Sequence, residues 1–300
     1  MIRSVLFFHL FLCIEHLSAQ ALVVLPGPSD PTELHFNQQF IARNRVANIV
    51  GQQMIKRDNR PMQEQKEKYL FRFDEQGRVI YSNNSFGQPG SGRDTASITY
   101  TYNEQGHAVR RLRNDLAGHF AYTIERDAEG RAIRETYSRI ENLGTDRYTL
   151  VPGVTTEISD EHYTYTSVND TTWRKLYMNN LNLPYREQTF TSDRKGYLLY
   201  IEDRYLITER RSRITFTYDE NGRLAGRVEQ PDLERPRKLH HSWLYDRTGN
   251  VISGELWHDD RQINRVEYLY EEATMLLKAR LTKDIETGQI NVVRYHTTVR

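Results

Sequence analysis

The chain has almost no cysteine. Among its 300 residues only Cys13 is a cysteine, and it lies in an apolar stretch near the amino terminus. If that stretch is removed, the mature protein has no thiol, which excludes disulfide bonds and cysteine nucleophiles. A disulfide-free secreted chain of this size is more typical of bacteria. Leu12 stands directly before Cys13, where a lipid-attachment signal has a small residue, so lipid anchoring at Cys13 is only an alternative.

An excess of charge of either sign is also missing. The chain has 41 basic and 40 acidic residues and a formal net charge of +1. Two short basic runs, 110–113 and 210–213, are flanked by acidic residues. A nucleic-acid-binding protein concentrates positive charge on one face. The composition therefore predicts no nucleic-acid partner.

Long apolar runs are absent outside the first residues. Arg3, the apolar residues 5–14 and the small residues Ala19 and Ala21 match a secretory signal peptide with its cleavage site. The apolar stretch is too short to span a membrane as a helix. We therefore expect a signal peptide at 1–21 and no membrane span after its cleavage. The expected location is secreted, periplasmic or at the bacterial cell surface.

What the chain does have is a short phrase in six copies. Each copy is an alternating run with an aromatic residue, then Asp or Asn, two spacers, Gly, and an apolar residue two positions later. Asp or Asn first and Gly fourth are the preferred ends of a type I turn, and a left-handed Gly closes a β-hairpin. The polar and glycine positions are Asp74 and Gly77, Asn103 and Gly106, Asp127 and Gly130, Asp193 and Gly196, Asp219 and Gly222, and Asp246 and Gly249.

This spacing also predicts which residues face each other. One pair further from the turn than Tyr218, Phe216 is expected opposite Gly226. A seventh unit has Thr274 instead of glycine and is expected to place Tyr270 opposite Leu276. A slip of one residue would turn all the side chains of a strand to the other face. The pairs expected next to the turns are Phe73 with Val79, Tyr102 with Ala108, Ser192 with Leu198, Tyr218 with Leu224, and Tyr245 with Val251.

The repeats predict an all-β fold. Units of about 26 residues accommodate two strands each, giving an extended, twisted antiparallel sheet of tandem hairpins with roughly sixteen strands. Residues 22–31 are expected to be a linker, and 32–300 a single repeat domain. One short helix is expected near 32–43, starting at Asp30 and Pro31 and capping the open edge of the first hairpin. A non-repeat insertion is expected at about 140–157.

Three of the phrases resemble a known repeat. The residues at 73–79, 218–224 and 245–251 are similar to the tyrosine–aspartate (YD, or Rhs-type) repeats of bacterial surface and toxin-delivery proteins. In the large members of that family the repeats curl into a shell around a cargo. The resemblance implies an extended antiparallel repeat sheet on a secreted bacterial protein. The chain has fewer repeats than such a shell needs, their period is irregular, and no toxin domain follows.

No set of residues points to a catalytic centre, a cofactor or a metal. His240 and His241 are neighbours and point to opposite faces of a strand, while His258 and Asp260 supply only two ligands of a site that needs at least three. Trp173 and Trp257 lie outside the repeated aromatic register, as exposed contact residues often do. The insertion adds polar residues where solenoids often bind partners. The candidate binding residues are Trp173, Trp257, His258, Asp260, Asn142 and Asp146.

These observations favour a secreted or periplasmic, non-enzymatic protein that presents a β-sheet surface to a protein or a polysaccharide. A carbohydrate-active or other secreted hydrolase is an alternative, because paired carboxylates are defined only by their separation in space. An outer-membrane β-barrel is another, since signal-bearing chains of alternating strands build such barrels. Against it, Arg211, Arg213, Thr215 and Thr217 interrupt the apolar band that lipid requires.

Overall fold

The computed structural model describes residues 21–25, 27–28, 33–86 and 95–300. The expected signal peptide, except Ala21, and Cys13 lie outside these residues. So do Asp30 and Pro31, the expected helix start.

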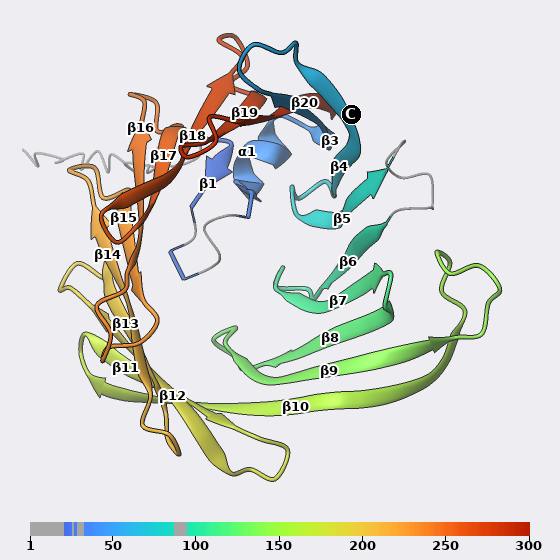
Figure 1. The fold of residues 1–300 in the computed structure, drawn as a ribbon. Coiled ribbons are helices and arrows are strands. Elements are labelled where there is room, and N and C mark those ends of the chain that lie inside the picture. The colour runs from blue at the N-terminus through green and yellow to red at the C-terminus, as the bar shows by residue number, and fades with distance from the viewer. Residues whose placement is uncertain (1–20, 26, 29–32, 87–94) are drawn as a thin grey trace, which may run out of the picture.

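The described residues form an all-β protein whose main sheet closes on itself (Figure 1). Strands β3 to β20 follow one another around an antiparallel barrel, and β20 pairs with β3. The expected open sheet of roughly sixteen strands is therefore wrong. The barrel has eighteen strands, and closure removes both free edges, which would otherwise invite pairing with other chains.

The bounds of the strands are as follows. They are β3 Val46–Lys56, β4 Gln63–Phe73, β5 Val79–Phe86, β6 Ala96–Tyr102, β7 Ala108–Asp115, β8 Gly118–Arg126, β9 Ala132–Asn142, β10 Pro152–Asn169, β11 Thr172–Met178, β12 Pro184–Ser192, β13 Leu198–Tyr205, β14 Arg211–Tyr218, β15 Leu224–Gln230, β16 Leu239–Tyr245, β17 Val251–His258, β18 Arg261–Tyr270, β19 Leu277–Asp284 and β20 Ile290–Val299.

The repeated phrase forms the hairpin turns that its spacing predicts. In the β14–β15 turn the N–H of Gly222 donates to the Asp219 carbonyl over 3.0 Å, and the Asp219 side chain accepts from the Arg223 N–H over 2.9 Å. Gly222 has a φ of +75°, a left-handed value that a side chain disfavours. The other five glycines of the phrase also have positive φ, namely Gly77, Gly106, Gly130, Gly196 and Gly249.

The register next to the turns is confirmed at all five expected pairs. One step further, the expectation is wrong: Gly226 lies opposite Thr217, and Phe216 lies opposite Arg227. Ala225 is an extra residue at this point, a β-bulge that shifts the pairing by one. In the seventh unit the turn is one residue longer than expected, so Tyr270 lies opposite Leu277 rather than Leu276.

All six turns of the phrase lie at one end of the barrel, which we call the turn rim. They connect β4–β5, β6–β7, β8–β9, β12–β13, β14–β15 and β16–β17, which are alternate connections of an antiparallel barrel. Tyrosine hydroxyls join neighbouring repeats here. Each donates to the carbonyl of the apolar residue that follows the preceding turn: Tyr102 to Val79, Tyr165 to Ala132, Tyr218 to Leu198, Tyr245 to Leu224, and Tyr270 to Val251, over 2.7 to 2.9 Å.

The described residues before β3 lie inside the ring of strands (Figure 1). They contain the small sheet of β1 (Val23–Val24) and β2 (His35–Phe36), followed by helix α1 (Gln38–Arg43). The Asn37 side chain caps the helix, so α1 begins later than the expected residue 32. It contacts β3 inside a closed barrel and caps no open edge. Leu22 and Val23 are 0% and 3% exposed, so the start of the expected linker is part of the core.

Half of the expected insertion at 140–157 is strand. β9 continues to Asn142 and β10 begins at Pro152, so only 143–151 form a loop between them. This loop lies at the end of the barrel away from the turn rim, which we call the opposite rim.

Candidate functional site

The two faces of the barrel wall differ in chemistry. Phe40 and Ile41 of the enclosed helix pack with Phe73, Val293 and Tyr295 of the wall, so these wall residues face the interior. Successive side chains of a strand alternate between faces, and the register extends this assignment around the barrel. The inner wall is rich in aromatic and aliphatic residues. A second inward cluster consists of Ile201, Phe216, Leu224, Trp243 and Val251.

A cavity of about 680 Å³ lies between the enclosed segment and strands β4 to β7. Leu34 and Phe36 contribute from the enclosed segment, and the Phe36 ring meets the Phe71 ring edge-on at 5.0 Å. The size is within the range of pockets that hold small molecules. The wall is mainly aromatic and aliphatic, with Tyr69, Phe71, Val79, Ala96, Ile98, Tyr100 and Tyr102 among its residues.

Arg111 gives this cavity a positive charge. It lies opposite Tyr100 on β7, and its guanidinium carbon is 5.2 Å from the centre of the Tyr122 ring. Its side chain forms no hydrogen bond or ion pair with any residue that the structure describes. The charge is therefore available to a ligand that carries a negative group.

A network of polar side chains covers the inner wall on β9 to β12. The Tyr163 hydroxyl lies 3.1 Å from Glu135 Oε2 and 3.0 Å from Glu161 Oε2, and Tyr185 donates to Glu161 Oε1 over 2.6 Å. Burial is the main cause that raises the pKa of Tyr163 and Tyr185, and the neighbouring glutamates raise it further. The two hydroxyls therefore stay protonated and act as donors at neutral pH.

Lys175 lies between two aromatic rings of this network. Its Nζ is 3.5 Å from the centre of the Tyr163 ring and 4.3 Å from that of Tyr177. No carboxylate of the described residues forms an ion pair with it, although Glu135 and Glu161 are near enough to attract its charge. Burial lowers the pKa of Lys175 to about 8, against the opposing effect of Glu135. The amine thus titrates close to physiological pH.

One strand further, an arginine and an aspartate form a bidentate pair. Arg186 Nε donates to both Asp203 oxygens over 2.9 Å, and Gln188 Nε2 donates to Asp203 Oδ2 over 2.7 Å. Arg186, Gln188 and Asp203 line a cavity of about 490 Å³ near the opposite rim. The carboxylate is fully engaged by protein donors, so this pair holds the wall together more than it offers a vacant contact.

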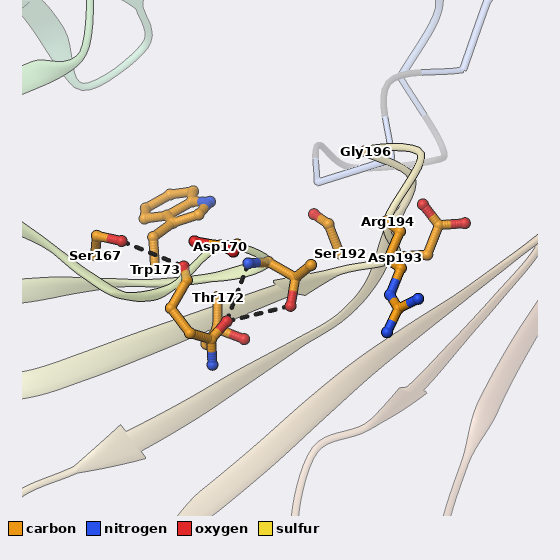
Figure 2. A pocket seen from close by; sticks show the side chains of 10 residues that line it. Ser167, Asp170, Thr172, Trp173, Ser192, Asp193, Arg194 and Gly196 are labelled. Atoms are coloured by element: carbon orange, nitrogen blue, oxygen red, sulfur yellow. Dashed lines mark hydrogen bonds between the residues drawn. The ribbon is translucent and has the colours of Figure 1, made fainter.

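Trp173 is the expected binding residue with the most suitable surroundings. It lies on the inner face of β11, stacks on Phe190 at 3.8 Å between ring centres, and is 36% exposed. Figure 2 shows Trp173 on one side of a pocket at the turn rim, with Arg194 and Gly196 of the β12–β13 turn on the other. The volume of this pocket is about 840 Å³. An exposed, rigidly stacked indole is a suitable surface for a planar or sugar-like group.

The remaining expected binding residues lie elsewhere. Trp257 is on the outer face of β17, where its Nε1 donates to Glu255 over 3.1 Å. His258 and Asp260 are exposed at the opposite rim, and His258 is 3.9 Å from the side chain of Asp259. The structure therefore does not bring these residues together with Trp173.

Asn142 and Asp146 do come together, in the loop 143–151. The Asn142 side chain donates to the Asp146 carbonyl and accepts from the N–H groups of Gly144 and Val151. Asp146 accepts from the N–H of Tyr148. Both side chains shape the loop, so the structure shows them as internal contacts of that loop.

The described residues contain no group of three or more His, Cys, Asp or Glu side chains arranged to hold a metal ion. Within the same residues, no helix is long and apolar enough to cross a membrane.

Sequence reasoning missed the inward cations Arg111 and Lys175, and also Arg280, which lies on β19 opposite the inward-facing Tyr268. Counting from the Tyr102–Ala108 pair would place Arg110 opposite Tyr100, but a β-bulge next to the turn shifts the pairing by one and brings Arg111 there, so the turn register alone does not identify Arg111. For Lys175 no such count is available, because its hairpin has no glycine phrase.

The comparisons with known proteins are weak. No protein-family model matches the chain, and no curated protein sequence matches it. Among solved structures, a porin-like protein from Bacteroides uniformis is 12% identical over 84% of this chain and 98% of its own, with a TM-score of 0.40. A porin-like protein from Bacteroides vulgatus is 9% identical over 85% and 98%, with a TM-score of 0.34. TcdB2-TccC3-TEV is 10% identical over 82% of this chain and 22% of its own, with a TM-score of 0.21. Similarities this low establish neither a family nor an activity.

Proposed function

We propose that this protein is a bacterial cell-envelope barrel that binds an anionic amphiphile in its interior. The observation that carries the proposal is the 680 Å³ cavity inside a closed barrel, with an aromatic and aliphatic wall and Arg111 among its lining residues. Each methylene of an acyl chain buried there contributes about 0.8 kcal/mol. Arg111, which has no hydrogen-bond or ion-pair partner among the described residues, supplies the contact for an acidic head group.

The side chains on the outer face of the wall favour a barrel that is surrounded by water. On this face Arg213 pairs with Glu202 over 2.6 Å, and Arg134 pairs with Asp160 over 2.8 Å. Thr215 and Thr217 are exposed on the same face of β14. A charge facing lipid at mid-membrane costs about 2–4 kcal/mol. An interior rich in aromatics and an exterior that carries these ion pairs and threonines suit a water-soluble container for an apolar ligand.

Calorimetric titration of the protein lacking residues 1–21 with dodecanoate and with dodecanol tests the proposal. We expect saturable binding of dodecanoate, and Arg111→Gln should weaken it about tenfold while leaving dodecanol binding unchanged. Arg110→Gln is the matched control, because Arg110 is the adjacent residue and faces outward opposite Thr101 and Thr123. If the wild-type protein binds neither compound, the proposal is wrong.

A second candidate is an outer-membrane β-barrel, and the specific observation that favours it is the closed antiparallel wall of eighteen strands. Membrane-spanning barrels need such closure, because no free strand edge is tolerated in lipid. For this candidate, the ion pairs on the outer face would have to be tolerated in contact with lipid.

Fractionation separates the two candidates. The signal-bearing chain is expressed in a Gram-negative host, and the envelope is fractionated without detergent. We expect the mature protein in the soluble periplasmic fraction. Recovery only after detergent extraction of outer membranes would instead support the second candidate, and then Glu202→Leu with Arg213→Leu should be tolerated.

The sequence suggested a binding surface on an open sheet. Because β20 pairs with β3 and the sheet has no open edge, we place the binding site in the barrel interior instead. If the protein binds a polysaccharide, the exposed Trp173 at the turn rim is the residue we expect to contact it. If the protein is a secreted hydrolase, we expect the carboxylates of the inner wall to act in catalysis. The resemblance to tyrosine–aspartate repeats remains a prediction; it is consistent with a barrel that encloses its ligand.

A further inference from the structure

Arg280 is an inward-facing arginine without a counter-ion. It lies on β19 between Tyr268 of β18 and Val293 of β20, which pack in the inward apolar clusters. Its Nε is buried and has no hydrogen-bond partner. Its side chain forms no hydrogen bond or ion pair with any described residue. A buried, unpaired donor on a charged group is costly, so native proteins satisfy such groups with water, an ion or a ligand.

Two tyrosines next to Arg280 also have no hydrogen-bond partner for their hydroxyls in the described part of the chain. Tyr268 is directly opposite Arg280, and Tyr295 is two positions along β20 from Val293, on the same face. Burial raises the pKa of Tyr295 to about 12 and also raises that of Tyr268, so both hydroxyls keep their protons at neutral pH. The positive charge of Arg280 acts on both phenols. A third tyrosine, Tyr69, already donates to Gln53.

The set is therefore rich in donors and poor in acceptors. An arginine side chain has five N–H donors and no acceptor, and a tyrosine hydroxyl adds one donor each. No carboxylate pairs with Arg280 in the described residues. Arg227, a buried arginine of the inner wall, also has an Nε without a hydrogen-bond partner, but it differs from Arg280 because it pairs with Glu229. What is missing around Arg280 is an acceptor with several oxygen atoms.

We propose that Arg280, Tyr268 and Tyr295 form a binding site for a tetrahedral oxyanion, either free phosphate or the phosphate group of a phosphorylated ligand. The guanidinium fork binds two oxygens of such a group, and the hydroxyls reach the others from neighbouring strands. The site does not depend on the amphiphile proposal. Arg280 and these two tyrosines are not among the lining residues of the 680 Å³ cavity.

Calorimetric titration with inorganic phosphate at constant ionic strength, balanced with chloride, tests the site. We expect saturable binding by the wild-type protein and a loss of about tenfold to hundredfold in affinity in Arg280→Gln. Arg265→Gln is the matched control, because Arg265 is on β18 and pairs with Glu267 on the outer face. Equal phosphate affinity in the Arg280 and Arg265 variants overturns the proposal. So does a wild-type protein that shows no saturable binding of inorganic phosphate or of either phosphorylated compound described below.

Tyr268→Phe and Tyr295→Phe keep the test valid if Arg280→Gln does not fold. Each removes one hydroxyl without changing the ring, and each should weaken phosphate binding severalfold. Unchanged affinity in both would contradict the site. Parallel titrations with glucose 6-phosphate and with short-chain phosphatidic acid identify the source of the phosphate group. Dodecanoate binding should be unchanged in Arg280→Gln, while phosphate binding should be unchanged in Arg111→Gln, so the two proposals can fail separately.

Discussion

The backbone of helix α1 closes over the first repeat turn at Gly77: a Cβ on that glycine would lie 2.1 Å from the carbonyl oxygen of Gln38. A contact this short against backbone cannot be relieved by rotating a side chain. At Gly249, which has the same place in its own repeat, nothing lies within 4 Å of such a Cβ. Glycines that the sequence makes equivalent therefore have different roles in the fold.

Alanine at these two positions should consequently destabilise the barrel unequally. Gly249→Ala introduces only left-handed backbone strain, about 1–2 kcal/mol. Gly77→Ala also displaces α1, which should lower the free energy of unfolding by about 1–3 kcal/mol more. Glu220→Ala, at an exposed turn spacer, should change stability by less than about 0.5 kcal/mol. Urea denaturation of the three variants measures this. Equal losses at both glycines would mean that α1 does not pack on the Gly77 turn.

The tyrosine hydroxyls that join neighbouring repeats should each contribute to stability. Tyr245→Phe removes the bond to the Leu224 carbonyl, and we expect a loss of about 1 kcal/mol. Tyr200→Phe is the control, because Tyr200 faces outward and its hydroxyl bonds to no described residue. Chemical denaturation of both variants gives the difference. A loss in Tyr200→Phe as large as in Tyr245→Phe would refute the specific role of the inter-repeat bond.

Because of Lys175, the free energy of unfolding should change with pH in the alkaline range. Burial lowers its folded-state pKa to about 8, below the ordinary 10.5, so between these values the unfolded chain binds one more proton than the folded chain. Unfolding free energy from this group therefore rises with pH across that window. Relative to Lys175→Met, the wild type should gain stability between pH 7 and pH 10.

Taking the difference between the two proteins cancels groups common to both. The charged and titratable groups around Lys175 are Glu135, Glu161, Arg186 and the nearby tyrosines, and they remain in the variant. Guanidinium melts at several pH values supply the curve. A difference that does not change with pH would show that Lys175 is not desolvated.

Asp246 should contribute stability that is lost in acid. Its burial raises its pKa, but hydrogen bonds from Thr248 and Asn250 lower it more, so the net pKa is below the ordinary 3.8. The contribution is present above pH 3.8 and disappears as pH falls through the folded-state value. Asp246→Asn should be less stable than wild type at pH 6, and the difference should shrink as pH falls through the folded-state pKa of Asp246. A constant gap across this range, measured by thermal unfolding, would contradict the shift.

The sequence predicted the local structure well because turn chemistry is local. Asp219, Gly222 and their counterparts specify the hairpins, and the register beside each turn follows by counting. Closure was not predictable, because it depends on summed twist and on pairing between residues more than 200 positions apart, such as Val293 with Gln53. The inward cations without an ion pair could not be predicted for the same reason. Whether Arg280 has a partner depends on side chains brought together by the closed wall, and composition shows only that charges balance.

The seam between β3 and β20 imposes an order on biosynthesis. Residues 290–299 must leave the ribosome before the wall can close, because they pair with both β19 and β3. Until then, every folded intermediate has two unpaired strand edges, each a template for joining another chain. We therefore expect the chain to be most exposed to aggregation just before the wall closes, because pairing between strands far apart in sequence forms slowly.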